Sequence, residues 1–94
     1  MDIEQERDHL SDLVGADEQW THLQVKKWGK SLVLYSGEGE DEQKHARLTH
    51  LKGATWGLSL AHHTGRWDRA PFTGSLEELW QMLVNDFAPF LEHY

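Results

Sequence analysis

The sequence predicts an α+β fold: a single antiparallel β-meander of four to five strands, with a C-terminal helix packed on one face and an N-terminal helix. Three patterns indicate this fold. Apolar residues alternate with polar ones along short segments between residues 20 and 70, glycine-containing turns separate these segments, and a capped amphipathic helix follows Ser75. The chain has 94 residues, which is the size of one domain, so residues 1–94 form a single unit.

Residues 2–14 are predicted to form the N-terminal helix. Asp2 can cap its start, and acidic residues occupy the first turns, where the helix dipole favours them. Gly15 is predicted to end the helix in a left-handed conformation. The apolar side chains that share one helical face are Ile3, Leu10, Leu13 and Val14.

Residues 20–36 are predicted to form a β-hairpin. Its two-residue turn is Gly29-Lys30, with Gly29 at a positive φ. This turn pairs Val25 with Leu34 and Lys27 with Leu32. The acidic segment 37–43 that follows is predicted to be a flexible loop.

Two more strands are predicted at residues 44–52 and 55–63, separated by a turn at residues 52–54. The turn length leaves their register open, and a shift of one residue would exchange the faces of Leu48 and Arg47. A short fifth strand runs from Arg66 to Ala70 and ends at Pro71. Its predicted register places Trp67 opposite His62.

The C-terminal helix has the clearest start signal, since Ser75 and Glu78 are spaced as a capping box. Pro89 is predicted to end or kink the helix near Phe87. The apolar stripe of this helix should cover the inner face of the sheet. The inner face is predicted to carry Leu23, Val25, Leu32, Leu34, Trp56, Leu58 and Leu60.

Composition excludes several classes of function. The net charge of −7 argues against nonspecific binding of nucleic acid and of anionic membranes. The chain has no cysteine, which excludes thiol nucleophiles and thiolate metal sites and fits a reducing compartment. No apolar run is long enough to span a membrane and no export leader opens the chain, so a cytoplasmic location is expected.

Candidate chemistry is sparse. His62 and His63 lie beside Asp68, but adjacent strand residues point to opposite faces, so a shared metal ion is not expected. His45 and His50 also fall on opposite faces. No motif places a nucleophile, a base and an oxyanion donor together. We therefore expect no catalytic residues, no metal and no cofactor.

A basic aromatic cluster is the candidate binding surface. Lys26, Trp28 and Tyr35 share the outer face of the predicted hairpin, and with Trp67 and Arg69 nearby they can form a basic aromatic patch. Single-strand binders use such patches as stacking platforms, and protein partners can also dock on them. Packing beneath the N-terminal helix would be the purely structural role of these side chains. The cluster consists of Trp28, Tyr35, Lys26, Trp67 and Arg69.

The segment from Gln24 to Phe90 resembles a family of small bacterial domains of unknown function. The resemblance implies a helix, an antiparallel sheet with paired strand tryptophans and a C-terminal helix, and it implies no activity. The residues that carry it are Trp56-Gly57-Leu58, Trp67, Leu76-Glu77-Glu78-Leu79 and Asp86-Phe87.

Three hypotheses for function follow. The first is a non-enzymatic, acidic domain that acts through protein–protein contacts, including self-association through an edge strand at residues 67–70. The second is an inhibitor or immunity-type protein that masks a basic partner. The third is a carrier of a small ligand, with a pocket between sheet and helix lined by Trp56, Trp67 and Trp80.

Overall fold

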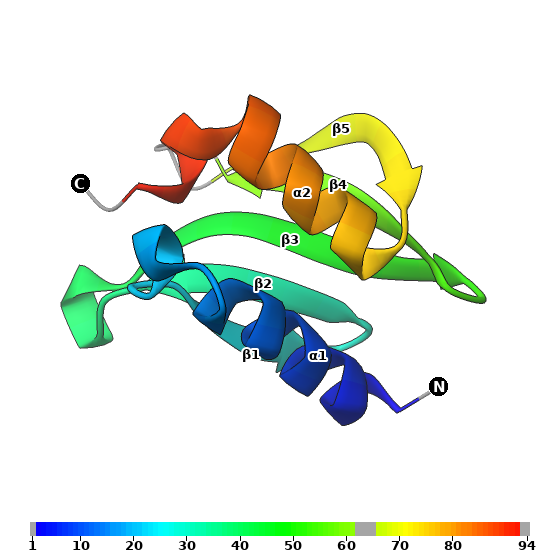
Figure 1. Cartoon of the computed structure of the whole chain (residues 1–94), viewed down its shortest axis with the longest axis horizontal. Coiled ribbons are helices and arrows are strands. Elements are labelled where there is room, and N and C mark those ends of the chain that lie inside the picture. Colours follow the sequence, from blue (N-terminus) through cyan, green and yellow to red (C-terminus); the bar gives the residue numbers. More distant parts are fainter. Residues whose placement is uncertain (1, 62–65, 93–94) are drawn as a thin grey trace.

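Two helices lie on the same side of a five-stranded antiparallel sheet in the computed structural model, which describes residues 2–61 and 66–92 (Figure 1). Each strand pairs with the next along the chain, so β1 and β5 are the edges of the sheet in this part of the molecule. The predicted α+β meander is therefore confirmed. The strands are β1 (Gln24–Trp28), β2 (Ser31–Ser36), β3 (Gln43–Lys52), β4 (Thr55–Ala61) and β5 (Trp67–Gly74).

Helix α1 (Ile3–Gly15) begins where the sequence predicts, because the Asp2 side chain accepts a hydrogen bond from the Glu4 amide at 3.0 Å. The prediction for Gly15 is wrong. Gly15 is the last residue of the helix, Ala16 follows in right-handed helical conformation, and neither residue has a positive φ. The chain then turns into a short 3-10 helix, η1 (Glu18–Trp20), which buries Trp20.

The β1–β2 hairpin has the predicted register. Val25 pairs with Leu34, Lys27 pairs with Leu32, and Gly29 has a φ of 62°. The acidic segment after β2 is more regular than predicted. It contains a short 3-10 helix, η2 (Gly39–Asp41), and β3 already begins at Gln43.

The register that the sequence leaves open between β3 and β4 is set by a bulge. His50 pairs with Trp56 and Lys52 with Thr55, which leaves Leu51 without an opposite residue. As a result Leu48 faces the core with 0% exposure, while Arg47 faces away from it.

Strand β5 corrects two predictions. It continues through Pro71 to Gly74, because the register is irregular between the pairs Gly57–Thr73 and Ser59–Arg69, and proline is tolerated at such irregularities on an edge strand. Trp67 pairs with Ala61 rather than with His62. This shift of one residue moves Trp67 from the helix side of the sheet to the opposite side.

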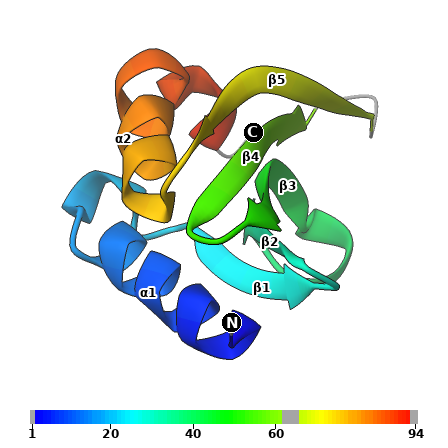
Figure 2. The same ribbon diagram turned by 90° about the vertical axis from the view of Figure 1, so that its right-hand side faces the viewer.

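Helix α2 (Leu76–Asp86) has the predicted capping box, and a 3-10 helix, η3 (Ala88–Leu91), follows it. Figure 2 shows α1 and α2 beside each other on one side of the sheet. All seven residues predicted for the inner face belong to this core, with Val25 only partly buried. The helical side chains that pack against them include Leu10, Val14, Leu76, Leu79, Trp80 and Leu83.

None of the helices formed by residues 2–61 and 66–92 combines the length and the apolar character that a membrane crossing requires.

Candidate functional site

The face of the sheet opposite the helices carries a row of residues that crosses all five strands. Direct pairing joins each member to the next in the order Lys26, Val33, Arg47, Ser59 and Arg69. Paired residues in an antiparallel sheet share a face, so the three cations all project on the side away from α1 and α2. We call this surface the open face.

Aromatic side chains flank the row at both ends of the sheet. Trp28 and Tyr35 lie on the open face because they alternate along β1 and β2 with residues that face the helices. Trp67 also lies on the open face, because it pairs with Ala61. The structure therefore places all five predicted residues of the binding surface on one face: Trp28, Tyr35, Lys26, Trp67 and Arg69.

These aromatic residues differ in exposure and in contacts. Trp28 is 56% exposed, whereas Trp20, Trp56 and Trp80 are at most 3% exposed. The Lys26 ammonium lies 4.5 Å from the centre of the Tyr35 ring. Such cation–π contacts hold long side chains against the sheet and restrict their rotamers.

Arg47 is a central member of the open face that the sequence analysis left out of the candidate surface. Its guanidinium carbon lies 4.8 Å from the centre of the Trp67 ring. Its Nε atom is buried and has no hydrogen-bond partner in the described part of the chain. The face of Arg47 is set by the bulge at Leu51, because a two-residue turn without this bulge would pair Arg47 with Leu60 on the core side.

Val33 is fully buried on the open face although no helix covers it, and it lies outside the main core cluster. Its two partners in the row are Lys26 and Arg47. The aliphatic stems of such long side chains can cover apolar neighbours while their charges stay near water. We attribute the burial of Val33 to this packing.

One carboxylate lies next to the cations of the open face. Lys26 Nζ donates to Glu42 Oε1 at 2.7 Å, and Lys44 Nζ donates to Glu42 Oε2 at 3.3 Å. These two hydrogen bonds, with the charges of both lysines, hold the pKa of Glu42 below its ordinary value. Arg47 and Arg69, in contrast, form no ion pair with any described carboxylate.

The histidines singled out in the sequence have different surroundings. The pair His62 and His63 lies outside the described residues. His50 hydrogen-bonds from Nε2 to the Gly53 carbonyl at 2.7 Å, and His45 is buried between β2 and η3. Among the residues that the structure describes, no three histidine or acidic side chains are grouped as a metal ion would require.

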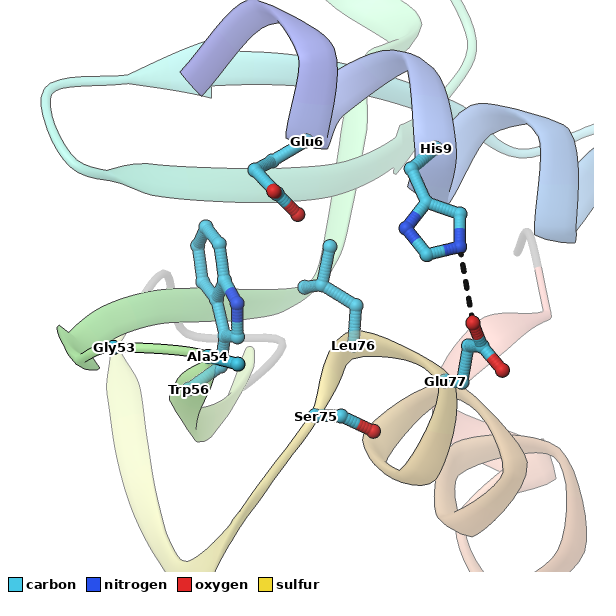
Figure 3. A pocket seen from close by; sticks show the side chains of 8 residues that line it. All are labelled: Glu6, His9, Gly53, Ala54, Trp56, Ser75, Leu76 and Glu77. Atoms are coloured by element: carbon cyan, nitrogen blue, oxygen red, sulfur yellow. Dashed lines mark ion pairs between the residues drawn. The ribbon is translucent and has the colours of Figure 1, made fainter. Parts of the chain in front are cut away.

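A cavity of about 430 Å³ lies between α1, the start of α2 and the β3–β4 turn (Figure 3). His9 and Glu77 close one side of it, with His9 Nε2 at 3.2 Å from Glu77 Oε1, and Trp56 forms another wall (Figure 3). The prediction that three tryptophans line one pocket between the sheet and a helix is wrong. Of the three tryptophans only Trp56 lines this cavity, Trp80 is buried in the core, and Trp67 lies on the open face.

The chain was compared with models of protein families, with curated proteins and with solved structures, and no match was found in any of the three comparisons.

Proposed function

We propose that this chain is a non-catalytic binding module that holds a protein partner on its open face. The observation that carries the proposal is the row across the five strands, which contains three cations and has three aromatic side chains around it. Tryptophan, tyrosine and arginine are the residue types that contribute most to binding energy at protein interfaces. The open face presents all three types on a rigid sheet.

The layout of charge supports the same proposal. Acidic residues are concentrated on the helix side, where α1 contains Glu4, Glu6, Asp8 and Asp12. The open face carries an excess of cations. A molecule whose acidic and basic residues lie on opposite sides orients a charged partner before contact. The surface of the partner that meets the open face should therefore be acidic.

The acidic helix side favours a second candidate function, the masking of a basic partner. Asp12 and Glu18 are both exposed, and they form no ion pair with the described basic residues. A basic protein could bind there by charge complementarity, as an inhibitor or immunity-type protein would require. The two candidate functions use opposite sides of the molecule and can be separated by mutation.

The test is a quantitative pull-down from a lysate of the source organism, followed by binding of the purified partner to variants. The W28A/R69A variant alters two exposed residues of the open face, and D12N/E18Q is the matched control on the helix side. We expect W28A/R69A to weaken partner binding by about tenfold or more, and the control to bind like the wild type. The reverse pattern would support the masking of a basic partner, and equal binding by both variants would exclude both sides.

A further inference from the structure

The cations of the open face fall into two groups. Lys26 and Lys44 share the carboxylate of Glu42, so their charge is partly neutralised within the chain. Arg47 and Arg69 have no carboxylate partner among residues 2–61 and 66–92. Within the row, the unneutralised positive charge is therefore carried by these two arginines.

Arg47 is held in a way that prepares it for an anion. Trp67 supports its guanidinium plane, and its Nε atom is shielded from water without an acceptor. A cation that is incompletely hydrated and unpaired gains more from an incoming anion than a fully hydrated one does. Holding the planar group against a ring also removes part of the entropy that binding would otherwise cost.

Arg69 lies on the same row, two strands from Arg47. Ser59 is between them and pairs with both. Adjacent strands are about 4.8 Å apart, which places the two arginine Cα atoms roughly 10 Å from each other. Arginine side chains are long enough to meet over Ser59 at that separation.

We infer that Arg47 and Arg69 form an anion site that binds a side-chain carboxylate of an acidic segment in the protein partner. This inference rests on the proposed function and names the chemistry of its site. The guanidinium fork accepts a carboxylate in a two-point geometry, which fixes the orientation of the segment on the sheet. Trp28, Trp67 and Tyr35 then contact the apolar residues that flank the carboxylate.

The number of unpaired cations favours a protein carboxylate over a nucleic acid. Nonspecific binding to a nucleic acid comes almost entirely from lysine and arginine contacts to phosphates, and DNA-binding proteins often make about six to ten of them. The row supplies two arginines without an internal partner, and the net charge of −7 repels a polyanion. A protein segment with one or two carboxylates and neighbouring apolar residues matches the two arginines and the aromatic side chains of the open face.

The test uses nuclear magnetic resonance of protein labelled with ¹⁵N-arginine, observed at the side-chain Nε–H groups. Decaglutamate is the probe, and decalysine and decauridylate are the comparison ligands. We expect decaglutamate to shift the Arg47 and Arg69 signals saturably. The signal of Arg7, which pairs with Asp8 on α1, should not move and serves as the internal control.

The variants R47Q and R69Q should each weaken decaglutamate binding by about tenfold, while R47K, which keeps the charge and loses the fork, should cause an intermediate loss. R7Q is the matched control and should bind like the wild type. Arg69 is exposed on an edge strand, so R69Q remains informative if R47Q fails to fold. Thermal unfolding checks the fold of each variant.

Two results would overturn the inference: equal shifts at Arg7, Arg47 and Arg69, or binding of decauridylate more tightly than decaglutamate. The partner pull-down separates this failure from that of the proposed function. A partner lost by W28A but retained by R47Q and R69Q would keep the open face as the binding site and reject the carboxylate. A partner retained by all three variants would reject both.

Discussion

His45 Nδ1 lies 2.8 Å from the carbonyl oxygen of Phe90, and this contact attaches the C-terminal segment to the sheet. A carbonyl only accepts hydrogen bonds, so Nδ1 carries the proton. In the neutral ring Nε2 is then the acceptor for the Ser36 hydroxyl, at 2.7 Å. His22 donates from its Nε2 atom to the neighbouring carbonyl of Leu91, at 2.8 Å. Two histidines thus hold two consecutive carbonyl groups of η3.

The first prediction concerns His45→Ala. His45 is 1% exposed, so its removal leaves a cavity and deprives the Phe90 carbonyl of a donor. We expect the free energy of unfolding to fall by about 2–4 kcal/mol. Urea unfolding measures this loss. S36A is the matched control because it removes the Ser36–His45 hydrogen bond but keeps the contact of His45 with η3, and it should cost only about 1 kcal/mol. A loss for H45A no larger than that for S36A would show that the contact to η3 contributes little.

The second prediction concerns the capping box at α2. Ser75 Oγ accepts from the Glu78 amide at 3.1 Å, and Glu78 Oε1 accepts from the Ser75 amide at 3.0 Å. S75A should lower the free energy of unfolding by about 1 kcal/mol, because an amide of the first turn loses its acceptor. S11A, at an exposed position within α1, is the control and should change stability by less than about 0.5 kcal/mol. Urea unfolding of both variants checks the difference.

The third prediction is the pH dependence of the same cap. The hydrogen bonds with Ser75, chiefly that from its backbone amide, lower the pKa of Glu78 from 4.5. A lowered folded-state pKa means that the carboxylate stabilises the fold above the unfolded pKa, and that this contribution disappears as the pH falls through the folded pKa. Wild type should therefore melt at a higher temperature than E78Q at neutral pH, and the gap should close below pH 4.5. A gap that stays constant down to the acid-unfolding limit would contradict the assignment.

Local chemistry explains which parts of the fold the sequence could predict. The hairpin at Gly29 and the cap at Ser75 depend on residues within four positions of each other, and both are as predicted. The length of β5 was not predictable in this way. Pro71 is a local stop signal, and only the irregular pairing with β4 makes it acceptable inside a strand.

The candidate surface was predictable only in part, for a reason of register. Trp28, Tyr35 and Lys26 belong to the hairpin whose register is set by its own turn. The placement of Arg47 on this face depends on the bulge at Leu51, and no local sequence pattern predicts that bulge. The pairing of Trp67 with Ala61 likewise depends on tertiary packing. The central arginine was therefore missed, although its neighbours on the open face were identified.

The fourth prediction concerns the solvent exposure of the Trp28 side chain. This residue is 56% exposed and Trp67 is partly exposed, whereas the other three tryptophans are buried. Acrylamide should therefore quench a subset of the fluorescence, and W28F should remove most of that subset without lowering stability by more than about 0.5 kcal/mol. W80F is the control and should leave the quenchable subset in place. Unchanged quenching in W28F would place Trp28 inside an interface or the core.

The last prediction links Glu42 to binding by the open face. Glu42 shares its carboxylate between Lys26 and Lys44, so it competes with any acidic partner for these cations. E42Q should raise the affinity for decaglutamate roughly two- to fivefold, because it releases Lys26 and Lys44 from their ion pairs with Glu42. E40Q removes an equal charge from η2 without a described lysine partner, and so it measures the effect of net charge alone. An equal gain in both variants would mean that Glu42 acts only through the total charge, and a gain confined to E42Q would show that the lysines of the open face contact the acidic segment.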